Sequence, residues 1–198
     1  MPTIPPIPHV DGLRRVLLFS GHRIDAPDRL RPRFPPAAQG LAATAIDAAL
    51  GTLGAGAEDL ALTQGAAGGD ILFAEACLRR GVRLVLMQPL PEAQFVDASV
   101  ASSVDGPHWV GRYAAVAARA AQPPRTLASN DAADVPGDAF TRCNQWMVES
   151  AAALGVPLQL VCLWDGSAGD GPGGTAHMVR AVSDRGGKVT WIDTRTLW

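Results

Sequence analysis

The stretch Leu60-Ala-Leu-Thr-Gln-Gly-Ala-Ala-Gly-Gly-Asp70, followed by Ile71-Leu-Phe-Ala-Glu-Ala-Cys-Leu-Arg-Arg80, decides the fold of this chain. Its pattern predicts a buried strand, a tight glycine-rich loop and a helix that ends at Gly81. Such a turn gathers backbone N–H groups at the positive end of a helix dipole, which suits a phosphate. The stretch therefore indicates an α/β fold and, at the same place, a site for an anion.

The alternation of strands and helices continues on both sides of this stretch. Apolar runs predict strands at 15–20, 59–63, 83–87, 158–164 and 188–193. Helical spacing and end signals predict helices at 37–50, 70–80, 92–100, 109–120, 138–154 (capped by Asp138) and 175–185. Residues 122–136 carry no clear element. The pattern predicts a three-layer Rossmann-like α/β domain with a mostly parallel sheet of five or more strands.

The length and composition of the chain fit one domain with a substantial core. The chain has 198 residues, 47% of them hydrophobic and 18% charged, and domains typically run to roughly 100–200 residues. Residues 1–12 contain four prolines and no periodicity. We therefore expect an extended arm at 1–12 and a single nucleotide-binding domain at 13–198.

Charge and patterning argue against nucleic-acid and membrane partners. The formal net charge is −2, without a long basic run. No apolar stretch reaches the roughly 18–20 residues that span a bilayer, and the first residues lack a signal-peptide pattern. An odd number of cysteines (Cys77, Cys143 and Cys162) in apolar contexts predicts buried free thiols in a reducing cytosol. We expect a cytoplasmic protein.

Polar or glycine-rich segments follow four of the predicted strands, at 20–22, 64–70, 88–89 and 165–175. The carboxyl ends of parallel strands share one sheet edge, and ligands bind there near a topological switch point. Two of the segments are glycine-rich loops that lead into helices, so this edge could hold two parts of one phosphorylated molecule. The alternative is that these glycines only form tight turns. Neither a Walker A sequence nor a Gly-x-Gly-x-x-Gly after the first strand is present.

Several of these segments, in this order, resemble the SLOG superfamily, a Rossmann-like group that includes the LOG phosphoribohydrolases and the DprA-type DNA-processing proteins. The resemblance covers roughly residues 14–193. It rests on Ser20-Gly21, on Thr63-Gln-Gly-Ala-Ala-Gly-Gly-Asp70 with Ala74, Ala76 and Gly81, on Phe140-Thr-Arg-Cys-Asn144 with Met147, and on Gly171-Pro-Gly-Gly-Thr175. The last segment is similar to the group's late phosphate loop.

The resemblance implies a pocket for a nucleotide or a nucleotide-derived ligand. Together with the strand-end loops, it predicts these ligand-binding residues: Ser20, Gly21, His22, Gln64, Gly65, Gly68, Gly69, Asp70, Asn144, Asp165, Gly171, Gly173, Gly174 and Thr175. Catalytic roles are assigned to Arg142 and His177. The LOG enzymes carry a catalytic glutamate three residues after the threonine of the late loop, where this chain has Met178, and the acidic companion of Arg142 is also missing.

Other side chains have two interpretations each. His22 could contact a phosphate or transfer a proton, or could bond locally, and Asp70 could favour the helix dipole or contact a ribose. Asp165 could hold ribose hydroxyls or a magnesium ion that accompanies a phosphorylated ligand, or could be solvated. Trp109 and Tyr113 are candidates for stacking on a base or for an interface. His108 is expected in an irregular stretch, and Trp146, Trp164 and Trp191 are expected in the core.

The sequence thus leaves two main functions open. The first is a nucleotide-ligand sensor or signalling module without turnover. The second is a hydrolase of the N-glycosidic bond of a nucleotide, with an active site that differs from the LOG pattern. A weaker third possibility is a domain whose glycine loops support a protein interface. No tight spacing of histidines and carboxylates indicates a metal site. The sequence is compatible with a homodimer. The long segments 21–36 and 101–136 have no assigned role.

Overall fold

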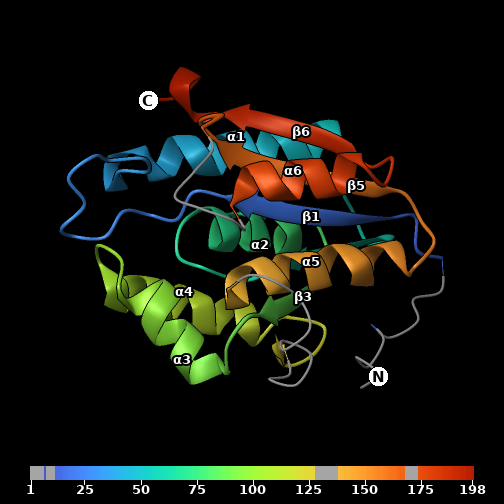
Figure 1. Cartoon of the computed structure of the whole chain (residues 1–198), viewed down its shortest axis with the longest axis horizontal. Coiled ribbons are helices and arrows are strands. Elements are labelled where there is room, and N and C mark those ends of the chain that lie inside the picture. Colours follow the sequence, from blue (N-terminus) through green and yellow to red (C-terminus); the bar gives the residue numbers. More distant parts are fainter. Residues whose placement is uncertain (1–6, 8–11, 128–137, 168–173) are drawn as a thin grey trace.

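The computed structural model describes residue 7 and residues 12–127, 138–167 and 174–198. Apart from Ile7 and Gly12, the predicted N-terminal arm lies outside the described residues. The chain forms one six-stranded sheet with the strand order β4-β3-β2-β1-β5-β6, and every neighbouring pair is parallel (Figure 1). The strands are β1 (Arg15–Gly21), β2 (Asp59–Thr63), β3 (Arg83–Gln88), β4 (Arg125–Thr126), β5 (Leu158–Trp164) and β6 (Lys188–Asp193).

Helices cover both faces of this sheet, which confirms the predicted three-layer Rossmann-like α/β fold. The helices are α1 (Gln39–Thr52), α2 (Gly69–Arg79), α3 (Glu92–Val96), α4 (Gly106–Ala117), α5 (Ala139–Ala152) and α6 (Thr175–Ser183). Short helical turns lie at Pro36–Ala38, Asp97–Ala101 and Thr194–Thr196. One core joins the sheet to α1, α2 and α4, and a second joins its other face to α5 and α6. Continuous apolarity in the central strands follows from this double cover.

Two predictions for the middle of the chain are wrong. Residues 122–136 are predicted to lack an element, and 128–136 lie outside the described residues. Within 122–127, however, β4 pairs with the end of β3, and the Leu127 N–H donates to the Gln88 carbonyl at 2.9 Å. A polar strand of two residues leaves no apolar run to detect. Helix α4 also begins at Gly106 rather than at Trp109, because Pro107 occupies its first turn, where a missing N–H costs nothing. His108 is therefore helical.

The predicted helix N-cap at Asp138 and the predicted buried, free cysteines are confirmed. The Asp138 carboxylate accepts the Thr141 N–H at 2.8 Å at the start of α5. Cys77, Cys143 and Cys162 are all buried and free, and burial raises the pKa of each thiol. Trp146 is buried as expected, but Trp191 is 48% exposed because β6 is an edge strand. None of the described helices is long and apolar enough to cross a membrane.

Candidate functional site

A cavity of about 190 Å³ lies at the carboxyl end of β1. After β1 the chain builds β2, β3 and β4 on one side and then returns to place β5 on the other. This is the topological switch point, where open α/β sheets bind ligands. The cavity is lined by strand ends, loops and helix starts: Phe19, Ser20, Gly21, Arg23, Gln64, Ala66, Asp70, Ser99, Phe140, Asn144, Gly174 and Thr175.

The structure brings half of the predicted ligand-binding residues to this cavity. Those that line it are Ser20, Gly21, Gln64, Asp70, Asn144, Gly174 and Thr175. Those at the same sheet edge but outside its lining are His22, Gly65, Gly68, Gly69 and Asp165. Gly171 and Gly173 lie outside the described residues.

Four N–H groups of the glycine-rich loop after β2 are hydrogen-bonded within the protein. The N–H groups of Gly65 and Ala66 donate to Asp70 Oδ2 at 3.1 and 3.4 Å. Those of Ala67 and Gly69 donate to the carbonyls of Ser99 and His22 at 3.0 and 3.1 Å. The loop is therefore not an open cradle for a phosphate.

Gly68 has a packing reason to be glycine. Its φ of 101° and ψ of −126° lie where other residues scarcely go. A Cβ atom there would stand 2.4 Å from the Ile24 backbone nitrogen. The segment after β1 lies directly on the loop, and the Ile24 N–H donates to the Ala67 carbonyl at 3.0 Å. The turn-forming alternative thus accounts for this glycine.

Asp70 combines a structural and a chemical feature. Its carboxylate closes the loop from the first turn of α2, and it also lines the cavity although it is only 9% exposed. Burial raises its pKa to about 6, against the loop N–H groups and the Thr63 hydroxyl, which favour the charged form. At neutral pH the cavity therefore holds a desolvated carboxylate.

The start of α6, unlike the glycine-rich loop after β2, has N–H groups that can bind a ligand. The N-cap residue, Gly174, brings no capping side chain, and the first N–H groups of a helix have no acceptor within it. The Thr175 hydroxyl lies 3.1 Å from the Ser20 hydroxyl, so two hydroxyls stand beside this helix end. N–H groups, hydroxyls and a helix dipole at one point favour an anionic group of a ligand.

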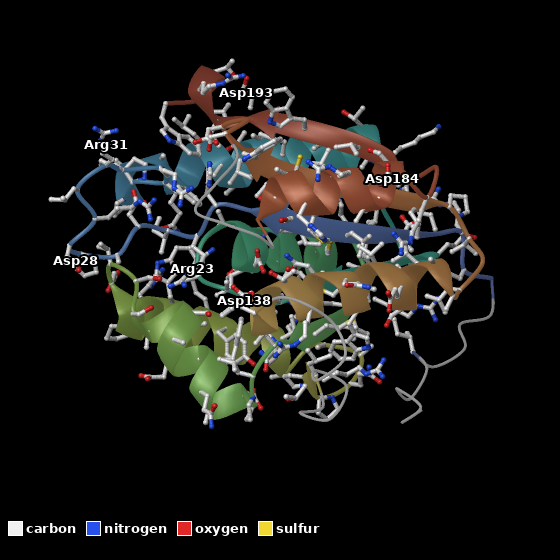
Figure 2. The ribbon with its side chains drawn as sticks, in the orientation of Figure 1. Arg23, Asp28, Arg31, Asp138, Asp184 and Asp193 are labelled. Carbon is white, nitrogen blue, oxygen red and sulfur yellow. The ribbon has the colours of Figure 1, made fainter. Side chains whose placement is uncertain are left out.

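Two further contacts shape the cavity. Gln64 Nε2 donates to Asn144 Oδ1 at 2.7 Å, which joins the loop after β2 to α5. Arg23, just after β1 (Figure 2), donates to the Ser102 hydroxyl at 3.0 Å. Desolvation lowers the pKa of Arg23, although the residue as a whole is exposed, and the charge of Asp70 acts in the opposite direction. The guanidinium brings a positive charge to the cavity wall.

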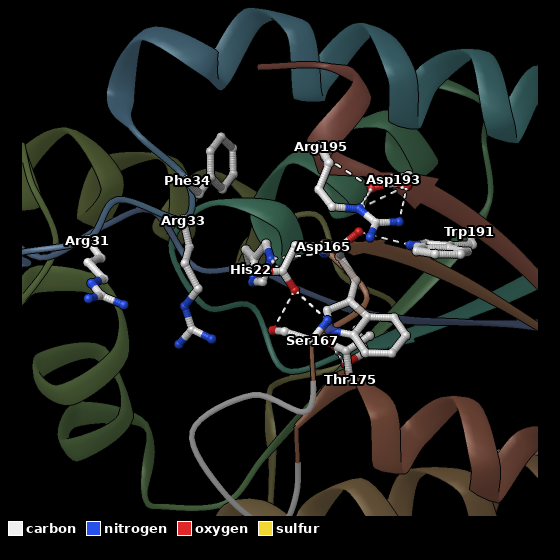
Figure 3. Close-up of polar contacts among 12 residues, drawn as sticks. His22, Arg31, Arg33, Phe34, Asp165, Ser167, Thr175, Trp191, Asp193 and Arg195 are labelled. Carbon is white, nitrogen blue, oxygen red and sulfur yellow. Dashed lines mark hydrogen bonds and ion pairs between the residues drawn. The ribbon is translucent and has the colours of Figure 1, made fainter.

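His22 connects the end of β1 to the end of β5 by hydrogen bonds. The ring Nε2 of His22 accepts the Asp165 N–H at 3.2 Å, and the backbone N–H of His22 donates to the Leu163 carbonyl at 2.9 Å. The Asp165 carboxylate lies 3.6 Å from the same Nε2 and accepts both the N–H and the hydroxyl of Ser167 (Figure 3). Burial lowers the pKa of His22, so the neutral ring is favoured. The local-bonding interpretation describes these contacts.

Replacement of His22 by alanine leaves the Asp165 N–H without its acceptor, and we expect it to lower the free energy of unfolding by about 1–3 kcal/mol. Because the pKa of His22 is lowered in the folded protein, wild type loses stability as pH falls below 6.5. The difference in free energy of unfolding between wild type and the variant therefore becomes smaller at low pH. Urea denaturation at several pH values measures both effects. His177→Ala is the control and should stay within about 0.5 kcal/mol of wild type. Equal stability of the two variants would contradict this role.

The positions assigned to catalysis do not meet in the cavity. Arg142 and His177 are absent from its lining. Met178, at the place of the glutamate in the LOG pattern, is completely buried in the core that α5 and α6 form with the sheet. The catalytic roles of Arg142 and His177 therefore stay predictions.

Trp109 and Tyr113 are not available for stacking on a ligand, contrary to prediction. Trp109 is 1% exposed, and both residues belong to the core beneath α4. The Tyr113 hydroxyl accepts from Gln88 Nε2 at 2.7 Å and donates to Glu92 at 2.9 Å. Helical spacing fits a core stripe as well as a stacking surface, and here the core prevails. Gln88 likewise serves this network and does not line the cavity.

Arg23, Ser99 and Phe140 line the cavity without having been predicted there. Phe140 carried a signal, since it belongs to the segment that resembles the SLOG helix. Arg23 and Ser99 carried none, because each reaches the cavity only through the folding of a long segment. Across the described ranges, no three His, Cys, Asp or Glu side chains gather where they could hold a metal ion.

Comparisons with known proteins define no family for this chain. No family model and no curated protein matches it. Among solved structures it is similar to the Moco carrier protein from Chlamydomonas reinhardtii, with 12% sequence identity and a TM-score of 0.34 over 93% of this chain and 97% of that chain. So weak a likeness carries no inference about function.

Proposed function

We propose that this chain binds a nucleotide or nucleotide-derived ligand at the carboxyl edge of its parallel sheet, as a sensor or signalling module. The observation that carries the proposal is the cavity at the switch point, with the Ser20 and Thr175 hydroxyls beside the start of α6. Residues 13–198 would act as a single domain, because all six strands belong to one sheet.

The ligand's phosphate belongs at the start of α6. Helix N-termini bind phosphates through their N–H groups and dipole. The hydroxyls of Ser20 and Thr175 hydrogen-bond to each other at 3.1 Å, so the pair leaves one O–H free to donate to a phosphate. The start of α2 suits a phosphate less well, because the Asp70 carboxylate accepts the N–H groups of Gly65 and Ala66, and backbone carbonyls accept those of Ala67 and Gly69. The sequence analysis named both glycine-rich loops as phosphate sites, and the proposal keeps the one that leads into α6.

The size and lining of the cavity suit the sugar-phosphate part of such a ligand. Its volume of about 190 Å³ is below the roughly 300–1,000 Å³ of pockets that enclose whole drug-sized ligands. The side chains of Gln64 and Asn144 supply amide groups on one wall, and Phe140 supplies an apolar face on which a base could stack. A ribose phosphate inside the cavity with a base toward its mouth agrees with these features.

Binding without turnover is the function proposed, rather than hydrolysis of an N-glycosidic bond. The hydrolase alternative depends on Arg142 and His177, which do not line the cavity, and on a position that holds a buried Met178. A binding module needs only the polar lining that is present. Chromatography after incubation with nucleoside monophosphates would reveal released base and thereby favour the alternative.

A thermal-shift screen with nucleoside monophosphates, ADP-ribose and cyclic dinucleotides tests the proposal. A ligand at 100 times its Kd should stabilise the protein by about 2.7 kcal/mol and raise its Tm by several degrees. Thr175→Val removes one hydroxyl with little change of volume and should reduce that rise. Thr44→Val, on the exposed face of α1, is the matched control and should leave it unchanged. No stabilisation by any compound at millimolar concentration would contradict the proposal.

A further inference from the structure

The wall of the cavity contains a buried hydroxyl without a hydrogen-bond partner among the described residues. Ser99 is 0% exposed, lines the cavity and lies in the π-helical turn at Asp97–Ala101. Its carbonyl accepts the Ala67 N–H at 3.0 Å, which fixes its backbone beside the glycine-rich loop. An unsatisfied buried hydroxyl is unfavourable, and π-helical turns are frequent at functional sites. A ligand atom would supply the missing partner.

The two charged groups in this wall have complementary hydrogen-bonding capacities. The ionised Asp70 carboxylate can only accept, and Oδ2 already receives the N–H groups of Gly65 and Ala66. The Arg23 guanidinium can only donate. It is tied to the end of the Ser99 turn, because it donates to the Ser102 hydroxyl, which itself donates to the Ala98 carbonyl at 2.8 Å. A pure acceptor, a pure donor and a free hydroxyl therefore line one cavity.

Only some ligand groups satisfy such a set. A phosphate oxygen accepts but does not donate, and the Asp70 carboxylate would repel it. A protonated amine or an exocyclic amino group donates to a carboxylate but gives Arg23 nothing to donate to. A sugar hydroxyl does both, because it donates one hydrogen bond and accepts others.

We propose that Asp70, Ser99 and Arg23 form a subsite for a ribose hydroxyl, so that the cavity selects ribonucleotides over their deoxy counterparts. The inference rests on the proposed function, since it assigns the sugar of the same ligand. The phosphate then lies at the start of α6, away from the Asp70 carboxylate. Sites that hydrogen-bond a substrate hydroxyl reject analogues without it, because their buried polar groups are left unpaired.

Calorimetric titration of the full chain with adenosine, guanosine, cytidine and uridine 5′-monophosphates, and with their 2′-deoxy and 3′-deoxy forms, tests this subsite. Wild type should bind at least one ribonucleotide about tenfold or more tightly than one of its deoxy forms. Ser99→Ala should reduce that preference to about threefold or less. Ser103→Ala is the matched control, because Ser103 also has a buried hydroxyl without a described partner but does not line the cavity. It should keep the wild-type preference.

The outcomes separate the subsite from the proposed function. Equal affinity of wild type for the ribo and deoxy forms of a bound nucleotide would overturn the subsite and leave nucleotide binding intact. An equal loss of preference in Ser99→Ala and Ser103→Ala would also overturn it, since the effect would then be indirect. Absence of binding by every nucleotide in this titration would overturn the subsite, and the proposed function as well only if no compound of the thermal-shift screen stabilises the protein. Denaturation curves show whether each variant is folded.

Discussion

Replacement of Gly68 by alanine is expected to lower the free energy of unfolding by about 3 kcal/mol or more. The added Cβ would stand 2.4 Å from the Ile24 nitrogen, and the backbone already has a φ of 101°. Relief requires the segment after β1 to lift from the loop, which breaks the hydrogen bond from the Ile24 N–H to the Ala67 carbonyl. Urea denaturation measures the loss.

Gly81→Ala is the matched control for this prediction. Gly81 also has a positive φ, 73°, but nothing lies within 4 Å of the position its Cβ would take. We expect a loss of about 1 kcal/mol, which reports backbone conformation alone. If the two variants were equally stable, the close contact between Gly68 and the segment after β1 would not be a determinant of stability.

Replacement of Asp70 by asparagine is expected to change how stability depends on pH. The pKa of Asp70 is raised to about 6 in the folded protein from 3.8, chiefly by burial. The folded state therefore binds more protons between these values, and wild type loses stability from this group as pH rises through them. The stability of the variant relative to wild type should thus increase by about 2 kcal/mol between pH 4 and pH 7.

Asparagine suits this test because its side-chain oxygen can still accept the N–H groups of Gly65 and Ala66. Asp193→Asn is the control. Asp193 pairs with Arg195, which lowers its pKa, so that variant should show no relative gain over the same range. A constant difference between Asp70→Asn and wild type would contradict a raised pKa for Asp70.

Much of the fold could be predicted because its signals are local. Apolar runs mark five of the six strands, and Gly81 and Asp138 mark helix ends by their own chemistry. The strand at Arg125–Thr126 is different, since it exists only through pairing with β3. Two polar residues have no hydrophobic pattern that predicts a strand, and the sequence therefore does not predict β4.

The candidate site could be predicted less completely, because part of it depends on contacts between distant segments. Ser20 lies at the end of a strand, Gln64 follows a strand and Thr175 begins a helix, so the rule that ligands bind at strand ends places them at the site. Arg23 and Ser99 instead reach the cavity because the segment after β1 and the turn at Asp97–Ala101 both pack on the glycine-rich loop. Close packing and phosphate binding both require glycine, so the residues at 65–69 could not distinguish these roles.

The most direct test of nucleotide binding at this cavity is a crystal structure of the protein soaked with adenosine 5′-monophosphate. We predict electron density for the nucleotide in the cavity, with the phosphate within hydrogen-bond distance of the Thr175 N–H and hydroxyl. A ribose hydroxyl should lie against Asp70 and Ser99. Density for the nucleotide at another surface, with the cavity occupied only by water, would contradict the assignment.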